Sequence, residues 1–235
     1  MQKVILEDLG RIDFKTAWDY QYELQRAIIA QKNERRDDPE YAAPLLPHRF
    51  LFCEHTPVYT LGKAGKIAHL LLSETDLQTK NIDFYPINRG GDITFHGIGQ
   101  VVGYPIFDLD RLFNDIGKYV RCLEEAAIRV CANYGIVAQR SDGESGAWLC
   151  DPDGTRWRKI CAVGIHLSRW VTMHGFAFNV NTDLRYYDHI VPCGIADKGV
   201  TSLQAELGRA VPEAEVKAKL LREFANLFEI DFIVM

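Results

Sequence analysis

Residues 89–104, which read RGGDITFHGIGQVVGY, constrain this chain more than any other stretch of its sequence. Glycine loses conformational entropy on folding and contributes no side-chain packing. The adjacent Gly90 and Gly91 beside Arg89 therefore predict backbone that approaches another group closely. A simple turn does not need Arg, Thr, His and Gln at this density. We interpret the first part of the stretch, residues 89–96, as a substrate cradle.

Length and charge limit the classes of function that the chain can have. Its 235 residues, of which 47% are hydrophobic, can bury a substantial core, and we expect one domain that spans residues 1–235. The formal net charge of -5, without a long basic run, argues against nucleic acids and anionic membranes as partners. No apolar run is long enough to cross a bilayer, and the first residues lack a signal-peptide pattern. We expect a cytoplasmic monomer.

The cysteine pattern argues against a disulfide framework and against a zinc site. None of the six cysteines has a CxxC spacing; they are Cys53, Cys122, Cys131, Cys150, Cys161 and Cys193. Reduced thiols are expected, most of them packed as small hydrophobic side chains, and no metal is expected.

Hydrophobic periodicity predicts long helices together with clustered strands, which is the pattern of a mixed α/β or α+β fold. Helices are predicted at residues 14–32, at residues 116–131 before Gly135, and from Pro212 onward. Residues 33–47, charged and then Pro-rich, are predicted to form an exposed loop. Strands are predicted at residues 49–54, 83–87, 101–106, 146–150, 156–163, 159–166 and 171–179, with 146–150 and 156–163 as a hairpin and a short turn near 168–170.

Cys193 differs from the other cysteines because it lies between Pro192 and Gly194. Pro fixes the preceding backbone and Gly permits an unusual turn, so this loop presents one side chain, whereas Cys131 lies within a periodic apolar run. A structural turn and a reactive thiol both fit this pattern. A nucleophilic thiol needs a nearby cation, a His or a helix N-terminus, and the candidate partners are Lys159, His96, His174 and His189.

The residues alone leave the roles of these partners open. Lys159 begins an apolar strand, and its side chain either reaches solvent at the strand end, which the spacing favours, or points into a site. His174 fits a hydrogen-bonded core histidine equally well, and His189 fits a turn. The basic segment 61–66, LGKAGK, does not match a phosphate-loop spacing; it is a flexible surface loop or a ligand contact.

The stretch at residues 89–104 resembles the signature of the octanoyltransferases of lipoate synthesis, the lipoyl(octanoyl) transferases. The signature positions are filled by Arg89, Gly90, Gly91, Thr94, Phe95, His96, Gly99, Gln100 and Tyr104. Three further blocks match in order, at residues 158–164, 174–179 and 190–195. The resemblance covers roughly residues 45 to 205.

The resemblance implies a fold similar to the catalytic domains of biotin and lipoate protein ligases, with a mixed sheet flanked by helices. Enzymes of this family transfer an octanoyl group from acyl carrier protein to a lysine of a lipoyl domain. The implied partners are octanoyl-acyl carrier protein, the lipoyl domains of 2-oxoacid dehydrogenases and the glycine cleavage H protein. No cofactor is implied, because the incoming thioester is already activated.

The resemblance also assigns roles to residues. Cys193 matches the nucleophile that carries the acyl chain, and Lys159 matches the lysine that activates it. The implied substrate-binding residues are Arg89, Gly90, Gly91, Asp92, Ile93, Thr94, Phe95, His96, Ala162, Val163, Gly164, Gly175, Phe176 and Ala177. Backbone N–H groups of residues 162–164 and of a turn at 175–177 are candidate oxyanion donors. His96 becomes a scaffold residue of the pocket.

One alternative nucleophile and three alternative functions follow from the same residues. Cys161 shares a strand face with Lys159 and is a second candidate thiol, although we expect it to be buried and protonated. An ATP-dependent ligase of the same superfamily needs no cysteine nucleophile, and a non-catalytic acyl-carrier-binding protein needs neither Cys193 nor Lys159. An amidotransferase that moves octanoyl groups between lipoyl domains shares the acyl-cysteine step. Candidate contacts to acidic carriers are Lys63, Lys66, Arg156 and Arg158.

Overall fold

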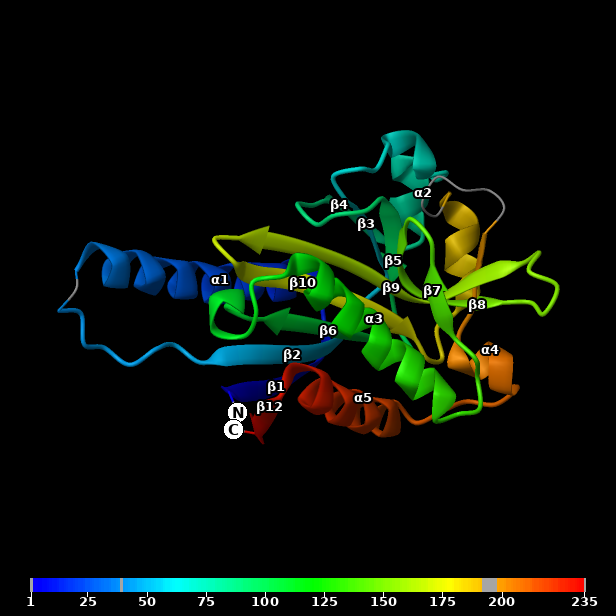
Figure 1. Ribbon diagram of the computed structural model, residues 1–235. Helices are drawn as coiled ribbons and strands as arrows, with labels where there is room; N and C mark the ends of the chain where they lie inside the picture. Colours follow the sequence, from blue (N-terminus) through cyan, green and yellow to red (C-terminus); the bar gives the residue numbers. More distant parts are fainter. Residues whose placement is uncertain (1, 39, 192–197, 235) are drawn as a thin grey trace.

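The computed structural model describes residues 2–38, 40–191 and 198–234, and its core consists of two β-sheets with helices packed on them (Figure 1). The larger sheet has the strand order β12-β1-β2-β6-β10-β9-β8-β7, with β11 paired to β9, and the smaller sheet has the order β4-β3-β5. Strand β1 is parallel to both its neighbours, whereas β2, β6, β10 and β9 pair antiparallel. The predicted mixed α/β fold is confirmed.

The strands of the larger sheet are β1 (Gln2–Ile12), β2 (His48–His55), β6 (Gln100–Ile106), β7 (Gln139–Ser141), β8 (Glu144–Cys150), β9 (Trp157–Ser168), β10 (Val171–Asn179), β11 (Gly199–Val200) and β12 (Ile230–Val234). The smaller sheet contains β3 (Val58–Leu61), β4 (Asp83–Pro86) and β5 (Ile93–His96). The α-helices are α1 (Phe14–Asp37), α2 (Glu74–Thr79), α3 (Ile116–Ala132), α4 (Leu203–Leu207) and α5 (Glu213–Phe228). Short 3₁₀ turns are η1 (Ile67–His69), η2 (Leu109–Arg111) and η3 (Leu184–His189).

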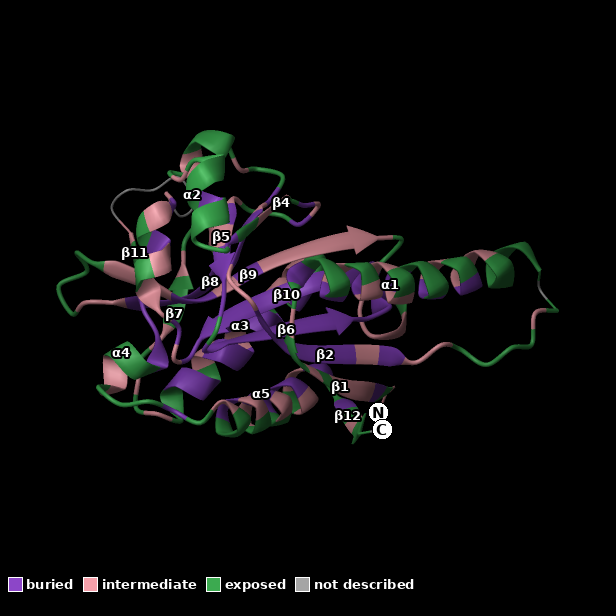
Figure 2. Ribbon diagram, turned by 180° about the vertical axis from the view of Figure 1, so that it is seen from behind, coloured by how far each residue is buried: buried purple, intermediate pink, exposed green. Residues whose placement is uncertain are grey.

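The larger sheet is buried on both faces because its strands alternate apolar side chains between two clusters. In β2, Phe50 and Phe52 pack against α3 and α5, whereas Leu51 and Cys53 pack in the cluster that contains residues of α1. Figure 2 accordingly shows the central strands as buried along most of their length. Helix α1 thus covers one face of the sheet, and α3 and α5 cover the other.

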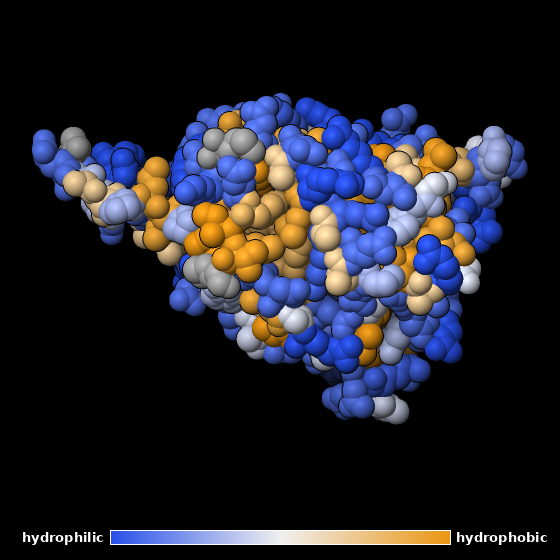
Figure 3. All heavy atoms as spheres, turned by 90° about the horizontal axis from the view of Figure 1, so that it is seen from below, coloured by the Kyte–Doolittle hydropathy of each residue, from blue (hydrophilic) through white to orange (hydrophobic). Residues whose placement is uncertain are grey.

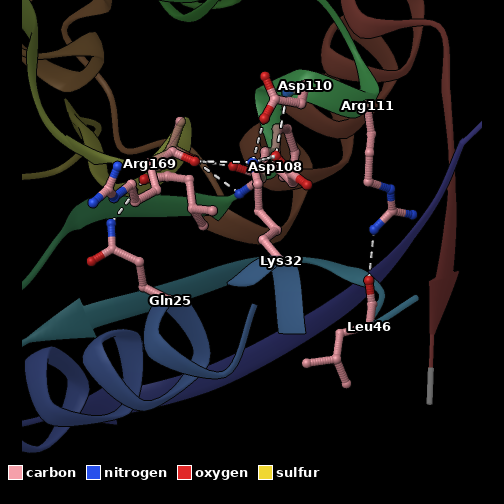
Figure 4. A network of polar contacts seen from close by, with 10 residues as sticks. Gln25, Lys32, Leu46, Asp108, Asp110, Arg111 and Arg169 are labelled. Atoms are coloured by element: carbon pink, nitrogen blue, oxygen red, sulfur yellow. Dashed lines mark hydrogen bonds and ion pairs between the residues drawn. The ribbon is translucent and has the colours of Figure 1, made fainter. Parts of the chain in front are cut away.

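Helix α1 is fixed to the larger sheet by polar contacts near its C-terminal half (Figure 4). The Nζ of Lys32 lies 2.5 Å from Asp108 Oδ1 and 2.5 Å from Asp110 Oδ2. It also donates to the carbonyl oxygen of Arg169, at 2.9 Å, in the turn between β9 and β10. Arg111 donates to the carbonyl oxygen of Leu46 at 2.7 Å, which holds the chain as it enters β2.

The C-terminal end of α1 is the boundary that differs most from the sequence prediction. Helix α1 continues to Asp37 instead of ending near Lys32, so residues 33–37 are helical and the prediction of a loop there was wrong. Four of these five residues are charged and none is apolar, and they continue the helix beyond the sheet. Figure 1 shows the end of α1 and the chain that leads to β2 projecting from the body of the molecule.

The other predicted helices and strands are present, whereas β1, β3, β5 and β12 were not predicted. Strands β8 and β9 form the predicted hairpin, β9 and β10 form the next one, and Pro212 is the N-cap of α5. In the described part of the chain no helix is long and apolar enough to cross a membrane. The view from the side of α5 and β12 shows a mostly hydrophilic surface with a local apolar area (Figure 3).

Candidate active site

A cavity of about 300 Å³ lies between strands β9 and β10 of the larger sheet and the cradle, residues 89–96, which ends in β5. Small residues form its floor: Ala162 pairs with Ala177 and Gly164 pairs with Gly175, so the two neighbouring strands present little side-chain volume here. A Cβ atom on Gly164 would lie 3.1 Å from the Cδ of Arg89. The floor and the cradle therefore approach each other closely, and the space between them fits a slender ligand.

The cradle is held in place by backbone and side-chain hydrogen bonds. The N–H of Gly90 donates to the carbonyl oxygen of Ile165 at 2.8 Å, and the guanidinium of Arg89 donates to the Thr60 carbonyl oxygen at 2.6 Å. The segment 61–66 packs on the cradle, with the N–H of Ala64 donating to the carbonyl oxygen of Gly91 at 3.1 Å. Ala64 itself lines the cavity, so the basic glycine segment contacts this site.

One end of the cavity carries two lysines beside an indole ring. The Nζ of Lys159 lies 4.4 Å from the ring centroid of Trp148, and the Nζ of Lys198 lies 5.0 Å from the same centroid. Glu144 accepts a hydrogen bond from Lys198 at 2.7 Å. An ammonium over an aromatic face is stabilised as a cation. The side chain of Lys159 thus lines the cavity instead of reaching away into solvent, as the spacing alone had favoured.

Gly146 gives the Lys159 side chain its path along β8. The φ angle of Gly146 is +121°, and a Cβ atom there would lie 2.4 Å from the carbonyl oxygen of Cys161 and 3.5 Å from the Lys159 Cδ. Only glycine adopts this backbone conformation without strain.

The histidines that line the cavity are neutral. Burial lowers the pKa of His96 to about 3, and Gln100 Oε1 lies 2.9 Å from its Nδ1. Burial also places the pKa of His174 well below its ordinary value, and its Nε2 lies 2.9 Å from Asn88 Oδ1. Neither ring can supply the positive charge that a thiolate needs near neutral pH. His189 does not line the cavity.

The structure brings together most of the residues that the sequence predicted for substrate binding. All of them line the cavity except Gly90, which bonds to β9, and Phe95, which stacks on Tyr186 with centroids 4.5 Å apart. Cys193 lies outside the described residues. The chain is described up to Val191, whose N–H donates to the His69 carbonyl oxygen at 2.8 Å, and again from Lys198, which lines the cavity.

Sequence reasoning missed Trp148, Glu144 and Lys198. Trp148 lies in an apolar strand, where the pattern predicts only core packing, and Lys198 belongs to no motif. These residues lie near Lys159 because β8 and β11 both pair with β9 at Lys159. Trp148 of β8 and Val200 of β11 are its pairing partners.

Two expectations about local chemistry have clear outcomes. Residues 175–177 belong to β10, not to a turn, and pair with β9 and with β6. Their peptide groups are engaged in the sheet, so the interpretation of this segment as a turn with free oxyanion donors was wrong. Cys161 is fully buried and its pKa lies well above its ordinary value, chiefly because of burial, as expected for a protonated packing residue.

Comparison with known proteins matches residues 13–225 to the lipoyl protein ligase A/B catalytic domain. An octanoyltransferase of Cytophaga hutchinsonii is 54% identical over 230 residues, which cover 97% of this chain and 94% of the relative. An octanoyltransferase of Flavobacterium psychrophilum is 54% identical over 236 residues, which cover 99% of this chain and 100% of the relative. The chain belongs to the octanoyltransferase family.

The resemblance drawn from the signature residues is thereby confirmed, and with it the expectation of an acyltransferase. A solved bipartite lipoate protein ligase from Thermoplasma acidophilum has a TM-score of 0.69 to this chain at 17% identity, covering 100% of this chain and 88% of that one. At this identity the likeness concerns the fold, and it confirms the ligase-like arrangement of sheets and helices.

Proposed function

We propose that this octanoyltransferase moves the octanoyl group from octanoyl-acyl carrier protein to a lysine of lipoyl domains through a thioester on Cys193. The observation that supports it best is the narrow cavity with an Ala and Gly floor and a lysine at one end. Lys159 lies beside the strand that follows the Cys193 segment, since Val200 pairs with it.

The first half-reaction forms the acyl-enzyme. The Cys193 thiolate attacks the carbonyl carbon of the incoming thioester, and the bond between this carbon and the carrier sulfur breaks. The Lys159 ammonium stabilises the thiolate and then gives a proton to the departing carrier sulfur. The enzyme is left with a neutral Lys159 and an octanoyl thioester.

The second half-reaction delivers the chain. The acceptor lysine attacks the Cys193 thioester, the carbon–sulfur bond to the enzyme breaks, and the neutral Lys159 amine accepts the proton that the attacking nitrogen loses. The Cys193 thiolate and the Lys159 ammonium are restored. Catalysis here consists of aligning the amine and keeping water away from the thioester.

The N–H of Val163 is the oxyanion donor that we favour. The Val163 carbonyl oxygen accepts a hydrogen bond from Ser145 Oγ at 2.8 Å. This carbonyl therefore points to the β8 edge of β9, away from β10. In an antiparallel strand the N–H and the C=O of one residue point to the same edge. This N–H therefore faces the cavity side beyond Ala147 and Cys161, the last β8–β9 pair.

The deciding experiment is intact-protein mass spectrometry after incubation with octanoyl-acyl carrier protein in the absence of ATP. We expect one octanoyl increment, absent in Cys193→Ala and retained in Cys161→Ser, and its transfer to an added lipoyl domain. Labelling that requires ATP would favour the ligase alternative. Binding of both carriers without any increment would favour the non-catalytic alternative.

A donor comparison separates the transferase from the amidotransferase alternative. With octanoyl-acyl carrier protein and an octanoylated lipoyl domain supplied at equal concentrations, we expect the first to load the enzyme faster. Docking of the acidic carriers is assigned to Lys63, Lys66 and Arg156, which are exposed. Arg158 contributes less because Asp151 and Glu206 pair with its guanidinium.

A further inference from the structure

A histidine and a carboxylate meet between the cradle and the chain that leads to Cys193. The Nδ1 of His69 lies 2.6 Å from the Oδ2 of Asp92, and only 20% and 10% of these two side chains are exposed. We propose that this contact positions the cradle relative to the Cys193 nucleophile, which makes His69 a positioning residue for acyl transfer. The role of Cys193 rests on the proposed function, whereas the contact itself does not.

The main chain around His69 pairs with residues 189–191, which lead to Cys193. The His69 carbonyl oxygen accepts a hydrogen bond from the N–H of Val191 at 2.8 Å. A second backbone hydrogen bond, 2.9 Å long, joins residues 71 and 189, and an antiparallel bridge lies between the two bonds. Val191 is two positions before Cys193 in the sequence. This pairing therefore holds the chain up to two residues before the nucleophile.

The Asp92 carboxylate is held by the cradle itself and by the segment that packs on it. Its Oδ1 accepts a hydrogen bond from the N–H of Ile93 at 2.6 Å, and its backbone carbonyl accepts one from the N–H of Gly62 at 3.2 Å. Gly65 leaves space for the carboxylate, since a Cβ atom there would lie 2.7 Å from the same Oδ1. Both carboxylate oxygens are thus engaged, one by the cradle backbone and one by His69.

His69 therefore contacts both parts of the site that must meet during acyl transfer. Its carbonyl oxygen binds the chain that leads to the nucleophile, and its imidazole binds Asp92, which lines the cavity. An acyl chain that lies against the cradle presents its carbonyl carbon correctly only if the thiol is at a fixed distance. A displacement of about 1 Å between reacting groups lowers a rate by about 100-fold. The contact thus acts on the rate of acyl transfer and not on the binding of the acyl chain.

Acid–base catalysis is the other role that a histidine paired with a carboxylate can have. A catalytic base must reach the reacting atoms, and His69 is not among the described residues that line the cavity. The geometry therefore favours positioning. The two roles differ in His69→Asn, because the amide nitrogen of Asn can take the place of Nδ1 and donate to Asp92, but an amide does not serve as a base.

The protein should fold without this contact, because other contacts hold the same region. Phe95 of β5 stacks on Tyr186 of η3 with centroids 4.5 Å apart, and the Tyr59 hydroxyl donates to the Tyr186 carbonyl oxygen at 2.6 Å. These contacts attach η3 to the smaller sheet independently of His69. The thermal unfolding midpoint of a His69 variant should therefore stay close to that of the unmodified protein.

Single-turnover acylation by octanoyl-acyl carrier protein, followed by intact-protein mass spectrometry, tests the proposal. We expect the acylation rate to fall by about 10- to 100-fold in His69→Leu and to return to within about threefold in His69→Asn. Alkylation of Cys193 by iodoacetamide should change by less than about twofold in both variants, because this small reagent does not use the cradle. Binding of free octanoic acid, measured by calorimetry, should also stay within about twofold, because the cavity is intact.

His189→Leu is the matched control. His189 takes part in the same backbone pairing through its carbonyl oxygen, and its side chain makes no hydrogen bond to the described residues. This variant should be acylated at the unmodified rate. An acylation rate that is unchanged in His69→Leu, or lowered equally in His189→Leu, overturns the proposal. A rate that stays low in His69→Asn overturns it in favour of acid–base catalysis, and a parallel loss of alkylation and octanoate binding overturns it in favour of a general disruption.

Amide hydrogen exchange distinguishes failure of the proposal from failure of the proposed function. If the unmodified protein gains no octanoyl group, the proposed function fails. Faster exchange of the Val191 and Ile93 amides in His69→Leu, restored in His69→Asn, would then keep the contact as the link between the two segments, and unchanged exchange would remove it. A protein that is acylated on Cys193 at the same rate with and without the His69 side chain keeps the function and loses the positioning role.

Discussion

Lys159 illustrates how one side chain acquires a chemical role from its neighbours. Its ammonium lies over Trp148, whereas Lys198 beside the same ring is paired with Glu144. The charge of Lys198 is therefore largely offset by Glu144, and the ammonium of Lys159 lies at the same end of the cavity.

We predict that Lys159→Ala raises the apparent pKa of the Cys193 thiol, which in the unmodified protein titrates below the free-thiol value of about 8.5. The measurement is the rate of iodoacetamide inactivation as a function of pH. Lys198→Ala is the control and should shift the profile less. A Lys159→Ala profile that coincides with that of the unmodified protein removes Lys159 from the activating role.

Gly146→Ala should destabilise the protein by about 2 kcal/mol or more, because its Cβ meets a backbone oxygen and its φ is strained for any other residue. Gly154→Ala is matched to it: φ there is +77°, but no atom of the described residues lies within 4 Å of the added Cβ, so only about 1 kcal/mol is expected. Equal changes in the urea midpoints of the two variants would show that close approach at Gly146 has no energetic effect.

Residue types alone predicted the cradle, because a glycine pair marks close approach, whereas the floor residues came from the signature resemblance. Residue types did not decide the role of Lys159, since its direction depends on Trp148, which lies 11 positions earlier and reaches it through strand pairing. The signature resemblance assigned that role.

At the scale of elements, the turn between β9 and β10 carries strain. Arg169 and Trp170 both have positive φ, at 49° and 63°, a conformation that favours Asn and Gly. The Lys32 hydrogen bond to the Arg169 carbonyl oxygen helps to hold it. The turn thus links α1 to the two strands that form the floor.

Arg169→Asn should raise the free energy of unfolding by about 0.5 kcal/mol, because Asn tolerates the left-handed region better than Arg. The same change at the exposed Arg156, whose φ is not positive, serves as the control and should have no such effect. Chemical denaturation with both variants measures the difference, and a destabilised Arg169→Asn would contradict the account.

Element predictions succeeded where the apolar pattern was strong, as in α3, β9 and β10. They failed at residues 33–37, where charged residues continue α1 beyond the sheet without an apolar stripe. Periodicity reports which face is buried, so a helix segment that buries little carries no such signal.

Across the whole molecule, buried neutral histidines couple stability to pH. Burial lowers the pKa of His48 to about 3, of His55 to about 4 and of His96 to about 3. The unfolded chain binds protons on these groups below about pH 6.5, and the folded chain does not. Their stabilisation is fully present above that pH and is lost as the pH falls toward 4, by up to about 1.4 kcal/mol per unit for each histidine.

His48→Phe should reduce the slope of the free energy of unfolding against pH by about the contribution of one histidine. The His48 ring stacks on Phe107 with centroids 5.4 Å apart, and neither of its nitrogens has a hydrogen-bond partner among the described residues. The replacement should also stabilise the protein at pH 5. Urea denaturation between pH 4 and pH 8 tests both statements, and a slope as steep as that of the unmodified protein would contradict them.

The two floor strands lie in the middle of the larger sheet, with Phe176 and Phe178 of β10 in its main cluster. Amide hydrogens of β10 should therefore exchange with deuterium only when the whole molecule unfolds. Binding of an acyl chain in the cavity can therefore slow the exchange of these amides only a little further. The added protection from exchange should appear in residues 61–66 and 89–92, which form the cavity wall opposite the floor. Slower exchange in these segments would then report that an acyl chain occupies the cavity.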